Sequence, residues 1–155
     1  MASLLDGLLA ESSLADKAVR IDDHLVRLQW GSAFVIAGIS GSAVVAIAPM
    51  FRALPAGKEQ AFFRKLLEHN AHMGGIASFA LQPDGWVVLH AGRGLKGIDG
   101  HEFETMVAAV GRFADQFDDE LITEFFAGKR EPAPLDDELA LPSADDSDAN
   151  LPQTD

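Results

Sequence analysis

The sequence contains no cysteine among its 155 residues. Disulfide bonds, thiolate metal sites and cysteine nucleophiles are therefore excluded, and a cytoplasmic location is compatible with the composition. Long apolar runs are also missing, because no segment approaches the roughly 18 uninterrupted apolar residues that a membrane span needs. The start, MASLLDGLLAESS, has no basic region and its apolar run is broken by Asp6, unlike a signal peptide. We expect a soluble protein without membrane insertion.

Basic residues are scarce, with 12 Lys and Arg against 24 Asp and Glu and a formal net charge of -12. Such a charge repels phosphate backbones and anionic lipid surfaces, so nucleic acid is not expected as a partner. Half of the excess lies in residues 128–155, which hold eight acidic and two basic residues.

The same C-terminal segment, residues 128–155, contains four prolines, no aromatic residue and no sustained apolar period. Burial therefore cannot offset the entropy lost on ordering it. We expect residues 1–127 to form a single domain and residues 128–155 to form a disordered acidic tail. The tail either only solvates the terminus or uses its LDDELAL sequence as a short docking segment.

The first third of the chain changes from helical to strand periodicity. Leucines recur at spacings of three to four within residues 2–15, which predicts an amphipathic helix. Apolar and polar residues then alternate from Val26 to Trp30, as in a half-buried strand. Residues 33–39 and 43–48 follow short Gly/Ser turns and are apolar on both faces, so they are strands that are covered on both sides or face a partner. The short turns favour antiparallel pairing.

The second half predicts a helix, a hairpin and another helix. Apolar residues at helical spacing follow Gly57, and the helix ends at Gly74, since glycine tolerates the left-handed conformation of a helix terminus. The hairpin turns at Pro83 to Gly85. Asp99 and Glu102 then have the spacing of a capping box and open a long amphipathic helix. The order α-β-β-β-α-β-β-α predicts an α+β fold with a five-stranded antiparallel sheet packed by helices.

The joints between these elements carry a resemblance to a known family. They are the leucine-rich helix ending at Asn70, the Gly74-Gly75 link into a small-residue strand, the hairpin from Leu81 to Leu89, and Leu95, Gly97, Ile98 and Asp99 before the last helix. On these features and on element order, residues 1–127 resemble the class I chaperones of bacterial type III secretion, also called Tir-chaperone-like or CesT-like. The resemblance implies a dimeric α/β sandwich without enzymatic activity or cofactors. It also implies that the N-terminal segment of a secreted effector is kept extended on the surface, through apolar patches and strand addition.

Two apolar surfaces are candidates for contacts with other chains. The candidate partner-binding residues are Leu4, Leu5, Leu8, Leu9, Val26, Leu28, Trp30, Phe34 and Ile36. The candidate dimer-interface residues are Phe62, Phe63, Leu66, Leu67 and Met73. In each case the alternative is that the helix simply covers the core of one copy. A five-stranded sheet leaves two edges for strand addition, and residues 33–39 and 43–48 are the suggested platforms.

Patterns typical of enzymes are incomplete. His69 and His72 lie three apart beside Glu68, a spacing that can bring two imidazoles to one metal, but the HExxH motif is absent and a solvated polar face also explains them. His90 and His101 have no nucleophile or paired carboxylate specified near them. The glycine-rich segments lack the spacing of a nucleotide-binding loop or a nucleophile elbow. We therefore expect no catalytic residue, no cofactor and no metal.

The sequence thus predicts a non-enzymatic homodimer in the bacterial cytoplasm. Its expected partner is an effector, or another protein, whose apolar and unfolded N-terminal segment it shields until export. The alternative is a regulatory or scaffold module that uses the same fold to bind a folded partner, with the acidic tail as a docking or autoinhibitory element.

Overall fold

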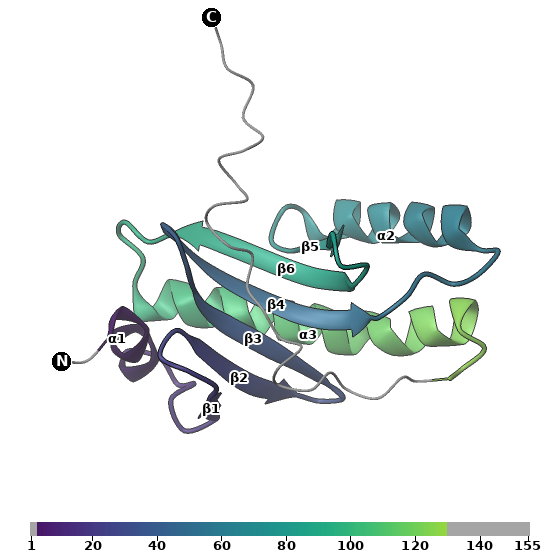
Figure 1. Cartoon of the computed structure of the whole chain (residues 1–155). Helices are drawn as coiled ribbons and strands as arrows, with labels where there is room; N and C mark the ends of the chain where they lie inside the picture. Colours follow the sequence, from purple (N-terminus) through teal and green to yellow (C-terminus); the bar gives the residue numbers. More distant parts are fainter. Residues whose placement is uncertain (1–2, 130–155) are drawn as a thin grey trace, which may run out of the picture.

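The computed structural model describes residues 3–129, which form three helices and six strands (Figure 1). The elements are α1 (Leu4–Ala10), β1 (Ala18–Arg20), β2 (Leu25–Trp30), β3 (Ala33–Ser40), β4 (Ala43–Phe51), α2 (Glu59–Met73), β5 (Ser78–Leu81), β6 (Val87–Gly94) and α3 (Gly100–Phe125). The α+β class and the predicted order are confirmed, with one additional short strand, β1. Residues 130–155 of the predicted tail lie outside the described residues.

The six strands form one antiparallel sheet in the order β1-β2-β3-β4-β6-β5. Two-residue turns join β2 to β3 and β3 to β4, where Gly31 and Gly41 adopt positive φ angles of 56° and 58°. The expectation of five strands is therefore wrong by one, because β1 extends the sheet beyond β2. The edges are β1 and β5. Strands β3 and β4, the suggested platforms, are each hydrogen-bonded to a strand on both sides, so neither is an edge for strand addition.

Helix α3 runs along one face of the sheet (Figure 1). The strand side chains that point toward it are almost completely buried, as Val35, Val44 and Leu89 show with exposed fractions of 0%. Burying each side chain of this size stabilises the fold by about 1.5–3 kcal/mol. Gly111 of α3 allows the helix to approach β2, because a Cβ there would lie 2.5 Å from the ring of Trp30.

Helix α1 packs on the start of α3 and is shorter than the predicted helix over residues 2–15. Ser3 and Asp6 form a capping box at its start. At its end, the Glu11 carboxylate accepts a hydrogen bond of 3.1 Å from the Gly100 N–H. A Cβ at Gly100 would lie 2.3 Å from the Cβ of Glu11, so glycine is what lets these two helix ends touch.

At the N-terminus of α3, one of the two hydrogen bonds of the predicted capping box is present. The Asp99 side chain accepts a hydrogen bond of 2.8 Å from the Glu102 N–H, as predicted. The Glu102 carboxylate makes an ion pair of 3.7 Å with Arg93 of β6. The Glu102 side chain therefore connects α3 to the sheet instead of capping the helix.

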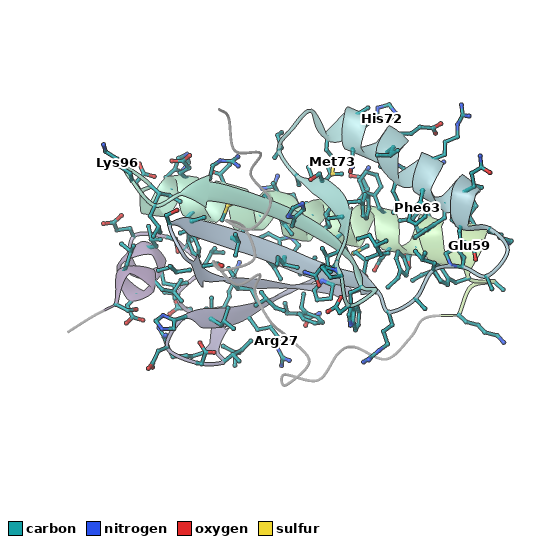
Figure 2. All side chains as sticks on the ribbon, turned by 45° about the horizontal axis from the view of Figure 1, so that its top comes forward. Arg27, Glu59, Phe63, His72, Met73 and Lys96 are labelled. Atoms are coloured by element: carbon teal, nitrogen blue, oxygen red, sulfur yellow. The ribbon has the colours of Figure 1, made fainter. Side chains whose placement is uncertain are left out.

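Helix α2 packs against β5 and against the second half of α3 (Figure 2). The Phe62 ring meets Phe125 edge-on with centroids 5.1 Å apart, and the His69 ring stacks on Phe117 at 4.1 Å. Lys65 adds an ion pair of 3.0 Å with Glu120 of α3. The helix ends at Gly74 in the left-handed conformation, as predicted.

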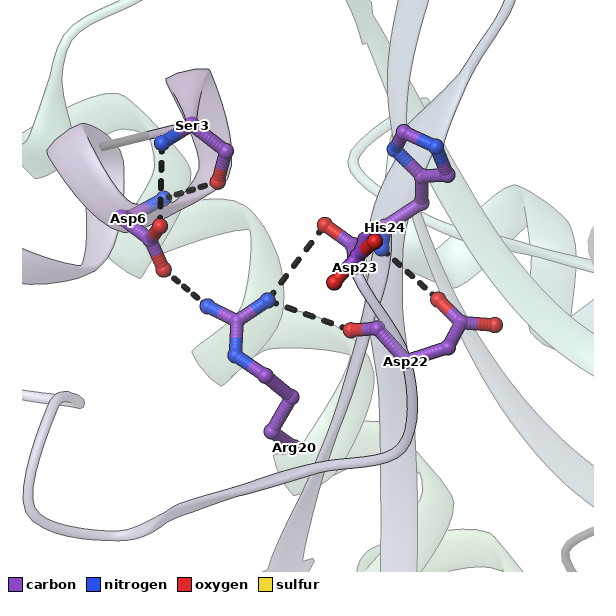
Figure 3. Close-up of polar contacts among 6 residues, drawn as sticks. All are labelled: Ser3, Asp6, Arg20, Asp22, Asp23 and His24. Atoms are coloured by element: carbon purple, nitrogen blue, oxygen red, sulfur yellow. Dashed lines mark hydrogen bonds and ion pairs between the residues drawn. The ribbon is translucent and has the colours of Figure 1, made fainter. Parts of the chain in front are cut away.

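Residues 20–24, for which the sequence pattern predicts no element, form the end of β1 and its turn into β2. The Arg20 guanidinium pairs with the Asp6 carboxylate of α1 and donates hydrogen bonds to the backbone carbonyls of Asp22 (3.1 Å) and Asp23 (3.4 Å) (Figure 3). The His24 N–H donates to the Asp22 carboxylate at 2.7 Å. Arg20 thus ties α1 to the β1–β2 turn.

Candidate protein-binding surface

At Phe79, the β5 edge of the sheet is closed by a side chain of α2. The Asn70 carboxamide accepts a hydrogen bond of 2.7 Å from the Phe79 N–H and donates one of 3.4 Å to the Phe79 carbonyl. These are backbone groups that an added strand would need. Another chain therefore cannot extend the sheet at Phe79 without displacing Asn70.

The β1 edge is bonded at its start, where the Ala18 N–H donates to the Leu14 carbonyl at 3.0 Å, but no described side chain bonds to the backbone of Arg20. The Ile21 N–H donates to the Leu25 carbonyl at 3.0 Å, which fixes the alternation of hydrogen bonds between β1 and β2. Val19, two residues earlier, is therefore also hydrogen-bonded to its partner in β2, Arg27. The residue between them, Arg20, has its backbone N–H and carbonyl directed away from β2. Val19 is 59% exposed beside them. At Arg20, the β1 edge therefore offers backbone groups to an extended chain.

A cavity of about 300 Å³ lies next to this edge, between α1 and the first two strands. It is lined by Asp6, Leu9, Ala10, Ala15, Ala18, Arg20 and Val26. The walls are mostly small or apolar, and the Asp6–Arg20 pair supplies the charges. Hydrogen bonds from Ser3, followed by the attraction of Arg20, lower the pKa of Asp6, so that this carboxylate is ionised at neutral pH.

The sheet face opposite α3 is crossed by none of the described helices (Figure 1), and we call it the open face. It includes Val19, Leu25, Arg27, Gln29, Phe34, Ile36, Gly38, Val45, Ile47, Val88 and His90. The strand register places Arg27, Ile36, Ile47 and His90 in one row across four neighbouring strands. The Arg27 guanidinium lies over the Phe34 ring, 5.7 Å from its centre. The face is therefore largely apolar with cationic and imidazole groups along it.

The predicted partner-binding residues do not share one surface. Leu5, Leu8 and Leu9 of α1 are buried with Val26 and Leu28 on the α3 side of the sheet, where Trp30 is partly buried. Phe34 and Ile36 lie on the open face, on the opposite side. Leu4 is 50% exposed at α1, and of the predicted set only Leu9 and Val26 line the cavity beside β1.

The predicted dimer residues divide into buried and accessible ones. Phe62, Leu66 and Met73 are 0%, 6% and 1% exposed, and they pack in the core of the single chain. Met73 lies on the side of α2 that faces the sheet, whereas His72 points outward (Figure 2). Phe63 is partly buried against the core and Leu67 is 67% exposed. The accessible apolar residues of this side of the molecule are Leu67, Ile76 and Leu81.

The histidines do not form a metal site. His69 stacks on Phe117, while His72 is exposed on the other side of α2. Within residues 3–129, no three His, Asp or Glu side chains are grouped as metal ligands. Burial is the main cause that lowers the pKa of His69, and the Glu120 carboxylate at 3.5 Å opposes this effect.

Several residues of the β1 region were not predicted as functional. Ala15, Ala18, Val19 and Arg20 carry no periodicity that marks a strand, because β1 has only three residues. One signal was present in the sequence: Arg20 stands just before the Asp22-Asp23 pair, and Asp6 is the one acidic residue within α1. None of the helices formed by residues 3–129 has the length and apolar character required to cross a bilayer.

Comparisons with known proteins agree on the fold. Residues 3–117 match the Tir chaperone protein (CesT) family. A chain of the heterodimeric complex ExoU–SpcU, from the type III secretion system of Pseudomonas aeruginosa, is similar with a TM-score of 0.50 and 15% identity, over 63% of this chain and 85% of that one. A chain of the ExsC–ExsE complex is similar with a TM-score of 0.55 and 19% identity, over 76% of this chain and 93% of that one. No curated protein matches the sequence.

The family match covers most of the sequence, and it confirms the resemblance drawn from the joints between the elements. The chain belongs to the Tir chaperone (CesT) family, whose members are non-enzymatic chaperones of type III secretion.

Proposed function

We propose that this chain holds the unfolded N-terminal segment of a type III secretion effector in an extended form along β1, in the bacterial cytoplasm, and keeps it competent for export. The observation that carries this proposal is the asymmetry of the two sheet edges. Asn70 occupies the outward backbone groups of Phe79 in β5, whereas β1 presents those of Arg20 beside an exposed Val19.

Strand addition combines two kinds of contact. Main-chain hydrogen bonds to an edge strand give affinity without regard to sequence, and pockets for alternate side chains give selectivity. The cavity beside β1, with a volume of about 300 Å³, has room for an apolar side chain of an added strand. The Asp6–Arg20 pair at its wall offers polar groups to the backbone that enters. An apolar, unfolded segment fits this site better than a folded surface does.

The proposal includes a homodimer formed through the α2 side of the molecule. Leu67, Ile76 and Leu81 are exposed there by 67%, 47% and 51%, and they belong to α2, β5 and the link between them. Exposed large apolar residues on adjoining elements are typical of a subunit interface. Because β5 and β1 lie at opposite ends of the sheet, a dimer built on this side leaves both β1 edges accessible.

The test is capture of the partner, followed by a change confined to the cavity. The tagged protein is purified from its own host at native expression, and the bound protein is identified by mass spectrometry. The affinity of the partner's N-terminal segment is then measured for the wild type and two variants. Ala15→Phe places a ring in the cavity, and Ala56→Phe makes the same change in the exposed loop before α2.

We expect Ala15→Phe to weaken binding at least tenfold, which corresponds to about 1.4 kcal/mol, while Ala56→Phe binds as the wild type does. Equal affinities for Ala15→Phe and the wild type would show that the cavity is not the binding site. Capture of a folded protein that binds without its N-terminal segment would instead support the regulatory or scaffold function.

A further inference from the structure

We propose that the open face is the docking surface for residues 130–155 of the same chain. The proposed occupant is the acidic C-terminal segment, which begins directly after the last described residue, Lys129. Three observations carry this inference: the charge of the face, its apolar floor, and the place where the segment starts.

The sheet differs in charge from the rest of the molecule. None of the six strands contains an Asp or Glu, although the chain holds 24 of them. Arg27 contributes its guanidinium to the open face, and Arg52, which follows the last residue of β4, lies over the Trp86 ring at 4.9 Å. A surface with positive groups and no carboxylates is suited to an acidic peptide.

The floor of the open face is apolar and almost completely buried. Ile36, Ile47 and Val88 are 3%, 4% and 3% exposed, although no described helix crosses them (Figure 1). They belong to β3, β4 and β6, so they form a continuous apolar strip over the centre of the sheet. Apolar side chains that settle on this strip would themselves be removed from water.

The segment starts close enough to reach the strip. Phe126, three residues before Lys129, stacks on Phe51 at the end of β4 with centroids 4.7 Å apart. Ile47 is four residues from Phe51 along the same strand, or about 13 Å at the rise of a strand. Its side chain lies on the open face, whereas Phe51 packs in the core, so the segment must pass around the end of the sheet. Residues 130–155, if extended, span roughly 85 Å. The tether therefore crosses the whole face and keeps the segment at high effective concentration beside it.

The composition of the segment complements the face. Four leucines, at positions 135, 139, 141 and 151, are separated by acidic groups that include Asp136, Asp137 and Glu138. The leucines can pack on the apolar strip, and the carboxylates are opposite in charge to Arg27 and Arg52. The short sequence LDDELAL is therefore placed at the centre of the proposed contact.

A docked segment has a consequence that rests on the proposed function. An effector chain that adds to β1 and continues across the sheet meets the acidic segment on the open face, so each displaces the other. The segment then acts as an internal placeholder that protects the apolar strip while no effector is bound.

The test uses the full chain and the absence of cysteine in it. A nitroxide label is attached at Ser143→Cys, and its broadening of the backbone amide signals is measured in isotope-labelled protein without any effector. We expect loss of the signals of Ile36 and Ile47 and full signals for His72 on α2. A second label at Thr154→Cys repeats the measurement. Weak, uniform broadening from both positions would overturn the proposal.

Two further experiments test whether the acidic side chains hold the segment, and whether the docked segment belongs to the same chain or to a second copy. Asp136→Asn, Asp137→Asn and Glu138→Gln together are expected to restore the signals of Ile36 and Ile47, while Asp16→Asn with Glu59→Gln is not. Signals that stay lost in the first variant would overturn the electrostatic match. A mixture of nitroxide-labelled and isotope-labelled chains must show no broadening, since broadening there assigns the docking to a second copy.

The competition has its own test, in which the effector segment is added to the labelled protein. We expect the signals of Ile36 and Ile47 to return. Docking that persists while the effector segment is bound would overturn the placeholder role and leave the proposed function standing. If the effector segment does not bind at all, the proposed function is contradicted. The docking of residues 130–155 is unaffected by that result, because it is measured without effector.

Discussion

Asn70 of α2 bonds to both backbone groups of Phe79 in β5, with distances of 2.7 Å and 3.4 Å. One side chain thus takes the place that a seventh strand would occupy at this residue. The helix and the edge strand are fixed to each other by polar contacts, in addition to the packing of α2 on α3.

Asn70→Ala removes the partner of a backbone N–H in a residue that is only 7% exposed. We expect the free energy of unfolding to fall by about 1–3 kcal/mol, because an unsatisfied buried donor loses its solvation without compensation. Chemical denaturation measures this change. Gln60→Ala, on the exposed side of the same helix, is the matched control and is expected to change stability by less than about 0.5 kcal/mol. Similar losses in both variants would contradict the role of Asn70.

Gly100→Ala and Gly7→Ala form a second matched pair. A Cβ at Gly100 would lie 2.3 Å from the Glu11 Cβ and 2.7 Å from its backbone carbon, so α1 and α3 must separate. We expect a loss of about 1–3 kcal/mol in the free energy of unfolding, typical of overpacking. Gly7, within α1, has open space around it, and alanine there is expected to be neutral or stabilising by up to about 1 kcal/mol. Thermal and chemical denaturation of both variants check the pair.

Leu67→Asp is expected to convert the proposed dimer into monomers. Leu67 is 67% exposed, so the change leaves the core of one chain intact while it places a charge in the interface. Leu4→Asp makes the same change at a residue 50% exposed on α1 and is expected to remain dimeric. Mass determination in solution over a range of concentrations measures both. A dimeric Leu67→Asp variant would exclude the α2 side as the interface.

His90 predicts how stability depends on pH. Burial lowers the pKa of His90 below its ordinary value of 6.5, so the folded protein binds a proton less readily than the unfolded chain. The free energy of unfolding is therefore highest above this value and falls as the pH decreases toward the pKa of the folded state.

His90→Gln is expected to make the loss of stability between about pH 7 and pH 5 smaller than in the wild type, because the titrating group is gone. Urea denaturation at several pH values gives the slope. His72→Gln, which removes an exposed imidazole from α2, is the comparison. An unchanged slope in His90→Gln would leave the pH dependence to His69, whose pKa is also lowered by burial.

Local signals in the sequence predicted the local features of the fold. The helix end at Gly74, the cap at Asp99 and the two-residue turn at Gly31 each depend on a few neighbouring residues, and all are present. The family resemblance rested on the same joints. By contrast, β1 is too short to show an alternation, and its pairing with β2 follows from the chain around it.

The predicted partner-binding residues lie on two faces of the sheet because of the turn between β2 and β3. A two-residue turn at Gly31 and Ser32 pairs Trp30 with Ala33, and therefore Leu28 with Val35. Val35 then shares a face with Leu28, and Phe34 and Ile36 lie on the other face. Alternation within each strand was correct, but the register between strands decides which alternating sets meet.

The burial of Phe62, Leu66 and Met73 could not be read from α2 alone. Helical spacing shows that they share one side of the helix, and it does not show what covers that side. The aromatic end of α3, with Phe117 and Phe125, covers it within the same chain.

The contact between Asn70 and Phe79 also bears on how copies of this protein avoid stacking into fibres. If the β1 edge of one copy paired with the β5 edge of the next, the contact would repeat without closing and produce a filament. Such growth needs two receptive edges on every molecule. Because Asn70 bonds to the backbone of Phe79 in β5, pairing of this edge with the β1 edge of another copy requires that Asn70 be displaced, which opposes filament growth.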